Sequence, residues 1–363
     1  MIVEGAILDA EGPRSGYVRF ARGRIVEVGR VGTDSTRGRQ RRVRGIVVPS
    51  PVNGHTHLGD AVGHREPPNR PLAELVRPPD GLKFRLLTES TTAQKVAAMR
   101  KALRRMAREG VAATIDFREE GRAGVEALRD AAAGTGVRPV ILGRPLARPV
   151  DPKELSAVLA VADGIGLSAA REESRATRDT VARACRRLGK RYALHASEET
   201  REAPDDFLAP RPDLLVHLTM ATFEDLTAVA EARVAVAVCP RSNALFGRRP
   251  DLASFERAGI RLLVGTDNAM FHSPSIWREL EFAYVSARLV RAPVSPLYLA
   301  LGALVEPWRW LGRPGSARIE AGSPARPLVL RLPPEDPAYQ VVCRATEHLM
   351  LRPGSPADRR SPA

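Results

Sequence analysis

Four histidines and one aspartate are the side chains of this sequence whose types and spacing best suit chemistry. Two of the histidines, His55 and His57, form a His-x-His pair within the segment NGHTH. Alternate side chains of an extended segment point to the same side, so these two imidazoles can share one cation. The other three residues each close a short apolar run: His195, His217 and Asp267. Imidazole nitrogens and carboxylate oxygens are ligands that divalent metals take in proteins, so the five residues form a candidate metal site.

Each of these residues also has an ordinary structural interpretation. An isolated His-x-His is often part of a turn, a single histidine after a strand is often simply hydrogen-bonded, and an aspartate there can cap a helix. The distribution of histidine favours the metal interpretation, because four of the seven histidines fall at the ends of predicted strands. The remaining three do not: His64, His272 and His348. We therefore predict a metal site, provided that the strands converge in the fold.

The middle of the chain alternates between short apolar runs and helical patterns. The runs end near Ser50, Asp116, Leu142, Ser168, His195, His217, Val238 and Asp267, at intervals of 21 to 29 residues from Asp116 onward. Helical patterns occupy residues 92–108, 123–133, 178–188, 223–232 and 275–289. Eight such units predict an α/β fold, the (β/α)8 TIM barrel, whose active sites lie at the carboxyl ends of the strands. Apolar runs such as 46–48 fit parallel strands that are buried on both faces.

Both ends of the chain alternate apolar and polar residues between glycines, which is typical of strands. The predicted strands are 6–10, 15–20, 23–29, 327–332 and 340–343. We expect the two ends to pair as one small composite β-sandwich domain.

Three domains follow from these patterns. The first part of the sandwich is predicted at 1–46, the barrel at 47–320, and the second part of the sandwich with a loose tail at 321–363. The segment 58–90 is rich in proline, glycine and charge, and we interpret it as an inserted loop over the site.

Composition narrows the class of protein. The 363 residues are 44% hydrophobic, which excludes a wholly disordered chain, and the three cysteines show no CxxC pairing. The net charge of +14 comes mainly from arginines that are spread along the chain and mixed with acids, so we expect no nucleic-acid partner. Neither a leader pattern nor an apolar run of membrane-spanning length is visible. We expect a cytoplasmic protein that acts on a small-molecule substrate and does not bind a membrane. A homo-oligomer is possible from the sequence.

With these motifs in their order, the chain resembles the amidohydrolase superfamily of metal-dependent hydrolases. Within it, the chain is similar to the branch of cytosine deaminases, chlorohydrolases and adenosylhomocysteine-type deaminases. The resemblance spans about residues 1–330, and the matching stretches are 49–57, 195–198, 216–219, 239–243 and 265–268. It implies the same barrel and the composite sandwich.

The resemblance also implies roles for individual residues. One divalent metal, zinc with iron or manganese as alternatives, would be bound by His55, His57, His195 and Asp267. Glu198 would move protons to and from the substrate, and Asp267 would also take the proton of the attacking water. His217 would polarise that water or the substrate. Binuclear members carry a carboxylated lysine at the end of strand four, where residues 164–169 contain no lysine, so a single ion is expected.

These roles predict an enzyme that hydrolyses a non-peptide carbon–nitrogen bond, with deamination of a nitrogen heterocycle by a metal-bound hydroxide as the main interpretation. The alternatives are a cyclic-amide hydrolase, a chlorohydrolase, or a non-catalytic homologue that binds an anion or nucleic acid. Arg118, Glu119 and Asn243 follow predicted strands and are candidate substrate-binding residues, as is Arg144. An arginine there would suit a carboxylate or phosphate group.

Overall fold

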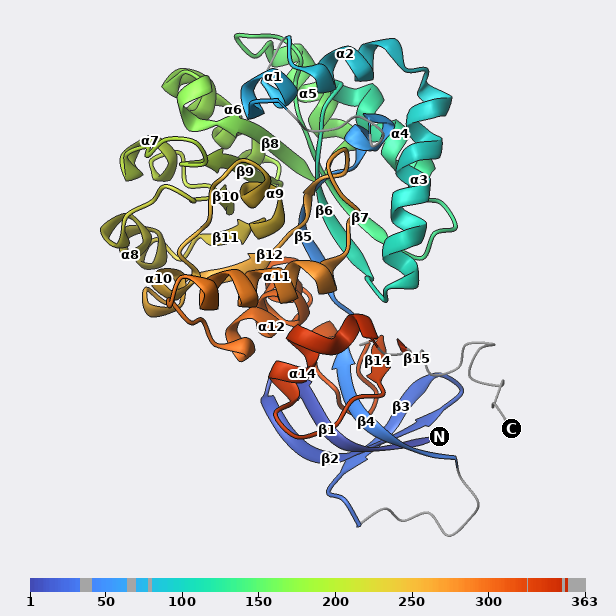
Figure 1. The fold of residues 1–363 in the computed structure, drawn as a ribbon. Coiled ribbons are helices and arrows are strands. Elements are labelled where there is room, and N and C mark those ends of the chain that lie inside the picture. Colours follow the sequence, from blue (N-terminus) through green and yellow to red (C-terminus); the bar gives the residue numbers. More distant parts are fainter. Residues whose placement is uncertain (33–40, 64–69, 78–79, 325, 348–349, 352–363) are drawn as a thin grey trace.

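A computed structural model describes residues 1–32, 41–63, 70–77, 80–324, 326–347 and 350–351 of the protein. Most of these residues form a barrel of parallel strands surrounded by helices, and a separate sheet lies against one end of the barrel (Figure 1). Among the described helices, none combines the length and apolarity needed to cross a membrane.

The barrel sheet contains nine strands in the order β12-β11-β10-β9-β8-β7-β6-β5-β13. All neighbouring strands are parallel, and β13 pairs with β5, so the end of the sheet returns to its beginning. The predicted (β/α)8 barrel is thereby confirmed. The strands are β5 Val52–His57, β6 Ala113–Arg118, β7 Arg138–Gly143, β8 Gly164–Ala169, β9 Arg191–Ala196, β10 Leu214–His217, β11 Ala235–Val238, β12 Arg261–Val264 and β13 Asp267–Asn268.

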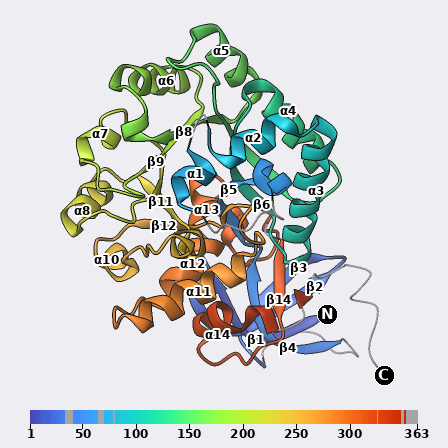
Figure 2. The same ribbon diagram turned by 45° about the horizontal axis from the view of Figure 1, so that its top comes forward.

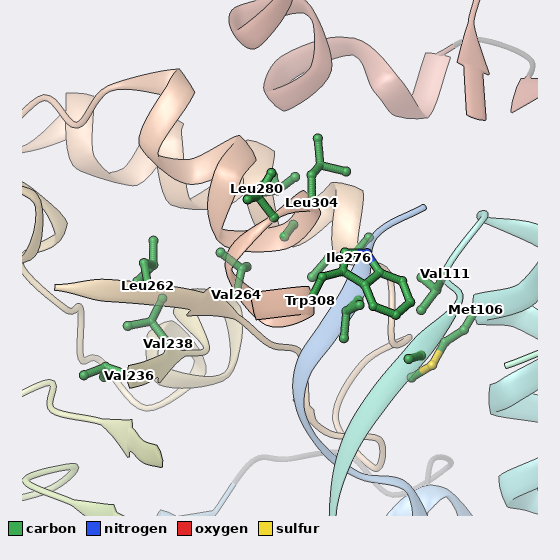
Figure 3. Close-up of a cluster of buried hydrophobic side chains, with 14 of the residues drawn as sticks. Met106, Val111, Val236, Val238, Leu262, Val264, Ile276, Leu280, Leu304 and Trp308 are labelled. Carbon is green, nitrogen blue, oxygen red and sulfur yellow. The ribbon is translucent and has the colours of Figure 1, made fainter. Parts of the chain in front are cut away.

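These strands are apolar because both of their faces are buried. Along β11, Val236 and Val238 belong to the large core between the sheet and the helices, whereas Ala235 and Ala237 belong to a second core. Figure 3 shows part of the large core, with Trp308 packed near the strands. Such two-sided burial explains why the strands are mainly apolar.

The helices surround the barrel, and sequence signals set their ends. Thr91 and Gln94 form a capping box that starts α3 at Thr92, where the pattern predicts it. The helices are α1 Leu72–Val76, α2 Leu82–Glu89, α3 Thr92–Arg108, α4 Gly121–Ala132, α5 Pro152–Val161, α6 Arg175–Arg187, α7 Pro204–Leu208, α8 Phe223–Glu231, α9 Pro240–Leu245, α10 Leu252–Arg257, α11 Ile276–Leu289, α12 Pro296–Leu304, α13 Glu306–Trp310 and α14 Pro337–Arg344.

The second sheet has six strands in the order β15-β14-β4-β1-β2-β3 and so contains strands from both ends of the chain. Residues 352–363, the greater part of the predicted tail, lie outside the described residues. The strands are β1 Ile2–Asp9, β2 Gly12–Ala21, β3 Arg24–Gly29, β4 Arg42–Pro49, β14 Pro327–Leu330 and β15 Met350–Leu351.

Three sequence expectations differ from the structure. The apolar run 46–48 lies in β4 of the six-stranded sheet, and the first barrel strand is β5, which itself contains the His-x-His pair. Residues 340–343 are helical, because Asp336 caps α14 and Pro337 starts it, while Val341 packs into the core. The segment 58–90 is largely helical: the 3-10 helix Leu58–Gly63, α1 and α2 occupy its described residues.

Candidate metal centre and active site

Strands far apart in the sequence bring the five predicted residues together at one end of the barrel. His55 and His57 are the fourth and sixth residues of β5, and His195 lies near the end of β9. His217 ends β10 and Asp267 begins β13. All five side chains are buried, from 0% exposure at His55 to 8% at His195 and Asp267. The convergence that the metal prediction required is therefore present.

The spacing of the ligand atoms fits one tetrahedral ion. The Nε2 atoms of His57 and His195 are 3.3 Å apart, and His55 Nε2 lies 3.3 Å from Asp267 Oδ1. His57 Nε2 lies 3.7 Å from the same oxygen. Two ligands at about 2.0–2.1 Å from a tetrahedral zinc are separated by about 3.3–3.4 Å. Two of these three separations match that value and the third is slightly longer, so the side chains lie close to the arrangement that a shared divalent ion needs.

Hydrogen bonding leaves the right nitrogens available. His57 Nδ1 donates to Glu119 Oε1 at 2.9 Å and His195 Nδ1 donates to the Leu167 carbonyl at 2.9 Å, so both Nε2 atoms keep their lone pairs. In His55, which is fully buried, neither ring nitrogen has a hydrogen-bond partner among the described residues. Buried polar atoms are rarely left unsatisfied, and a metal ligand is an explanation of such an exception.

Electrostatics hold the same residues in the protonation states that a metal requires. Burial, reinforced by the Lys83 ammonium, lowers the pKa of His57 to about 3. Burial also lowers the pKa of His195 well below its ordinary value. Burial alone would raise the pKa of Asp267, but His55 and the other histidines outweigh it and hold that pKa well below the usual range. The set therefore consists of neutral imidazoles and an ionised carboxylate near neutral pH.

Backbone geometry at these strand ends is unusual. Asp267 has a φ of +57°, His217 of +77° and Ser197 of +46°, a region that non-glycine residues rarely adopt. Strain of this kind persists where surrounding structure enforces it, and it concentrates at functional sites. Here it turns the chain at the point where each strand delivers its side chain.

Two glycines let the strands that carry His55 and Asp267 approach each other. A Cβ on Gly265 would lie 2.5 Å from His55 N, and a Cβ on Gly54 would lie 2.9 Å from Val264 O. The sequence places glycine next to the ligands because β5 and β12 leave no room for a side chain there.

A second set of polar residues flanks the ligands. Glu198 Oε1 lies 3.5 Å from His217 Nε2, and the Asn243 amide lies 3.2 Å from His217 Nδ1 on the opposite side of the ring. Ser242 Oγ donates to Asp267 Oδ2 at 2.5 Å, which leaves Oδ1 toward the histidines. Burial raises the pKa of Glu198 above its ordinary value, so this carboxyl keeps a proton to a higher pH than an ordinary glutamate does.

These residues open into a solvent-open cavity at the carboxyl end of the barrel. It is lined by His57, His195, His217, Asp267 and Glu198. Leu72, Ala73 and Val76 of α1 line it too, as does Arg77 directly after that helix. Figure 2 shows α1 and α2 lying over this part of the barrel. The segment predicted as a loop over the site therefore does cover it, but as helices.

Comparisons with known proteins agree with this geometry. Residues 46–210 match the model of the "Amidohydrolase family". A putative aminohydrolase of Methanothermobacter thermautotrophicus is 34% identical over 322 residues, which cover 82% of this chain and 82% of that protein. The chain belongs to the amidohydrolase family. This amidohydrolase is therefore a hydrolase that acts on carbon–nitrogen bonds, and its buried histidine–aspartate cluster has the ligand types that suit a divalent metal.

Solved structures share the fold of this amidohydrolase. An adenosine deaminase of Xanthomonas campestris with bound zinc has a TM-score of 0.79 at 18% identity, covering 97% of this chain and 91% of its own. The atrazine chlorohydrolase TrzN of Arthrobacter aurescens, complexed with zinc, has a TM-score of 0.72 at 17% identity, covering 94% of this chain and 90% of its own.

The three predicted substrate-binding residues lie behind the cavity surface. Asn243 is 1% exposed and contacts His217. Arg118 and Glu119 are 1% and 3% exposed and bind each other at 2.6 Å. None of the three lines the cavity above the metal ligands, because the end of β6 and the start of α9 turn their side chains into the protein. Arg144, which follows β7, does line it.

Arg118 and Glu119 belong to a buried charge cluster that the sequence did not reveal. We call it the Lys83 network, and its members are Asp60, Lys83, Asp116, Arg118 and Glu119. The only sequence signal for it was the rarity of lysine, which occurs five times against many arginines. Lys83 and Asp60 lie in the segment that was interpreted as a loop.

Proposed function

We propose that this protein is a metal-dependent aminohydrolase that deaminates a nitrogen heterocycle carrying an anionic substituent. The observation that carries the proposal is the position of Glu198: a largely buried carboxyl with a raised pKa stands 3.5 Å from His217, next to the proposed four-residue ligand set, and lines the same cavity.

We propose that His55, His57, His195 and Asp267 would hold one divalent ion. Zinc is the best candidate because it takes this nitrogen and oxygen ligand set, and two of the separations, at 3.3 Å, fit a tetrahedral ion. A single ion is proposed because β8 contributes no lysine to the site. When bound, the ion supplies Lewis acidity that lowers the pKa of a bound water.

The chain itself would move the protons. Asp267 Oδ1 faces the histidines and stays ionised, so it would accept the proton that the attacking water loses. Glu198, whose carboxyl holds a proton more readily than an ordinary glutamate, would donate to a ring nitrogen and then to the leaving amine. His217, fixed from behind by Asn243, would hydrogen-bond to the substrate atom on which charge develops.

Arg144 supports an anionic substituent on the substrate. The other basic residues of the cavity are already paired: Arg77 and Arg171 with Glu199, and Lys83 with Glu119. Among the described residues, no hydrogen bond or ion pair involves the Arg144 guanidinium, although its backbone is fixed by Arg118 and Gly121. A partly buried, unpaired guanidinium in a cavity is suited to a carboxylate or phosphate of the ligand.

The fold neighbours indicate which heterocycles to test first. They include deaminases of adenosine and guanine and an aminofutalosine deaminase in complex with methylthio-coformycin. Amino-substituted purines and their nucleosides, with and without a carboxylate or phosphate, are therefore the first panel. Chlorinated triazines and cyclic amides test the alternative hydrolase reactions, and product analysis separates them from deamination.

The decisive experiment measures metal content and ammonia release on this panel. We expect about one zinc per chain in the wild type, and a decrease of about 10²–10⁴-fold in kcat for Glu198→Gln with the zinc retained. Turnover that is unchanged in this variant would remove Glu198 from the reaction. Salt-dependent retention of nucleic acid without hydrolysis of any panel member would instead favour the non-catalytic alternative.

Arg144→Met tests the anionic substituent. A charged hydrogen bond lost here should raise KM for the carboxylated or phosphorylated substrates by about 10-fold or more, with little effect on their neutral analogues. Arg122→Met is a matched control, since Arg122 is exposed on α4 and pairs with Glu126. Equal changes for charged and neutral substrates would contradict the role of Arg144.

A further inference from the structure

Glu119 makes an unusual number of charged contacts for a side chain that is 3% exposed. Its Oε1 atom accepts hydrogen bonds from His57 Nδ1 at 2.9 Å and from Lys83 Nζ at 2.6 Å. Its Oε2 atom accepts from Arg118 at 2.6 Å. The carboxylate is thus held by two cations, Lys83 and Arg118, and its third hydrogen bond is to the ring of the proposed ligand His57.

Lys83 reaches this position from α2, which lies outside the barrel strands. Its side chain is 4% exposed, and Nζ also lies 3.1 Å from Asp60 Oδ2. Burying an ammonium is costly unless its partners satisfy it, and these two carboxylates do so. His57, Asp60 and Glu119 have the spacing of a cation site, and the Lys83 ammonium occupies it.

Asp60, the second partner of Lys83, contacts β13, the strand that carries Asp267. Asp60 Oδ2 accepts from Asn268 Nδ2 at 2.6 Å. Asn268 follows Asp267 in β13 and pairs with His57 across the strands. Lys83 therefore connects the carboxylate behind His57 with the strand that carries Asp267.

We propose that Glu119, held in place by Lys83, is a positioning residue that fixes the His57 ring for metal binding. The inference rests on the metal site of the proposed function. A carboxylate that accepts from Nδ1 fixes the tautomer and the orientation of the imidazole, so that Nε2 keeps its lone pair toward His195 and Asp267. Lys83 acts through Glu119, because its ammonium and His57 share the same oxygen.

The first test measures Zn²⁺ affinity of the full-length protein by chelator competition, together with the absorption spectrum of the Co²⁺-substituted protein. Glu119→Gln should weaken Zn²⁺ binding by about 10–100-fold and change the Co²⁺ bands, because an amide can turn its nitrogen to the ring. Glu120→Gln is the matched control: Glu120 is the adjacent residue and binds Lys95 instead. Affinity and spectrum unchanged in Glu119→Gln would overturn the proposal.

The second test separates positioning from general structural support. Lys83→Met should weaken Zn²⁺ binding by no more than Glu119→Gln does, Lys83→Arg should restore part of the loss, and the double variant should match Glu119→Gln alone. Lys95→Met should leave Zn²⁺ affinity unchanged. Additive losses in the double variant would contradict an action of Lys83 through Glu119.

If Glu119→Gln does not fold, Lys83→Met and Lys83→Arg carry the test by the same two measurements, and unchanged affinity in Lys83→Met then overturns the proposal. A wild-type protein that binds no Zn²⁺ would overturn the metal site itself, which distinguishes that failure from an unaffected Glu119→Gln.

Discussion

Two buried polar clusters lie side by side at the carboxyl end of the barrel, and they are satisfied in different ways. In the Lys83 network every member has an oppositely charged partner within 4 Å, such as Arg118 with Glu119 at 2.6 Å. In the metal centre, His55 has two unsatisfied ring nitrogens, and the His57 and His195 lone pairs face each other at 3.3 Å. Asp267 also has a strained backbone.

This difference indicates that the Lys83 network stabilises the fold, whereas the histidine–aspartate cluster is suited to bind a ligand. Charges that satisfy each other inside the protein contribute to one defined structure, and removing one partner exposes the cost of burying the other. Two nitrogen lone pairs that face each other without a hydrogen-bond donor gain a favourable interaction only when a ligand binds between them. The two clusters meet at the His57–Glu119 hydrogen bond, so the paired cluster supports the unpaired one.

The largest expected effect comes from His195→Ala, which removes a ligand from the metal centre. Zn²⁺ affinity should fall by more than the roughly 100-fold that changes outside the ligand set cause, and ammonia release should reach background. Metal analysis and turnover of the purified variant check this. Wild-type zinc content in this variant would show that His195 is not a ligand.

Arg118→Leu should affect stability rather than metal binding first. It leaves Glu119 and Asp116 buried with fewer partners, which should lower the free energy of unfolding by about 3–5 kcal/mol in urea titrations. Arg122→Leu, which breaks the exposed pair with Glu126, should cost less than about 1 kcal/mol. Equal losses in the two variants would remove the contrast between buried and exposed pairs.

Gly265→Ala tests whether the close approach of the backbone next to His55 is needed for metal binding. The new methyl group would meet His55 N at 2.5 Å, so the backbone of β5 at His55 must shift, at a cost of about 1–3 kcal/mol. We expect weaker Zn²⁺ binding in chelator competition. Gly315→Ala is the control, since its methyl group would lie 3.5 Å from Pro324 in ordinary contact.

Stability should also depend on pH through Glu279, which belongs to neither cluster. Burial raises its pKa to about 8, although Arg241 acts against this. Between about pH 4.5 and 8 the folded state keeps a proton that the unfolded state loses, so this group lowers the free energy of unfolding as pH rises. Urea titrations at pH 5 and pH 8 should therefore show a smaller decrease for Glu279→Gln than for the wild type; parallel decreases would contradict it.

The convergence of the proposed ligands could be predicted from the sequence because they lie at or directly after the ends of buried apolar runs. His195, His217 and Asp267 each follow an apolar run, and in a parallel barrel all such ends meet at one face. The strand Ile46–Val48 was assigned to the wrong sheet, since an apolar run looks the same in either sheet. Residues 340–343 show the same ambiguity, which the Asp336 cap and the packing of Val341 resolve in favour of a helix.

The sequence by itself determined the barrel class and the identity of the residues with metal-binding chemistry, because periodicity and ligand type are local properties of the chain. Only the tertiary structure decided that Arg118 and Glu119 turn away from the cavity while Arg144 faces it, and that Lys83 from an outer helix stands behind His57. Which buried charge meets which partner depends on contacts between segments distant in sequence, and no local pattern encodes those contacts.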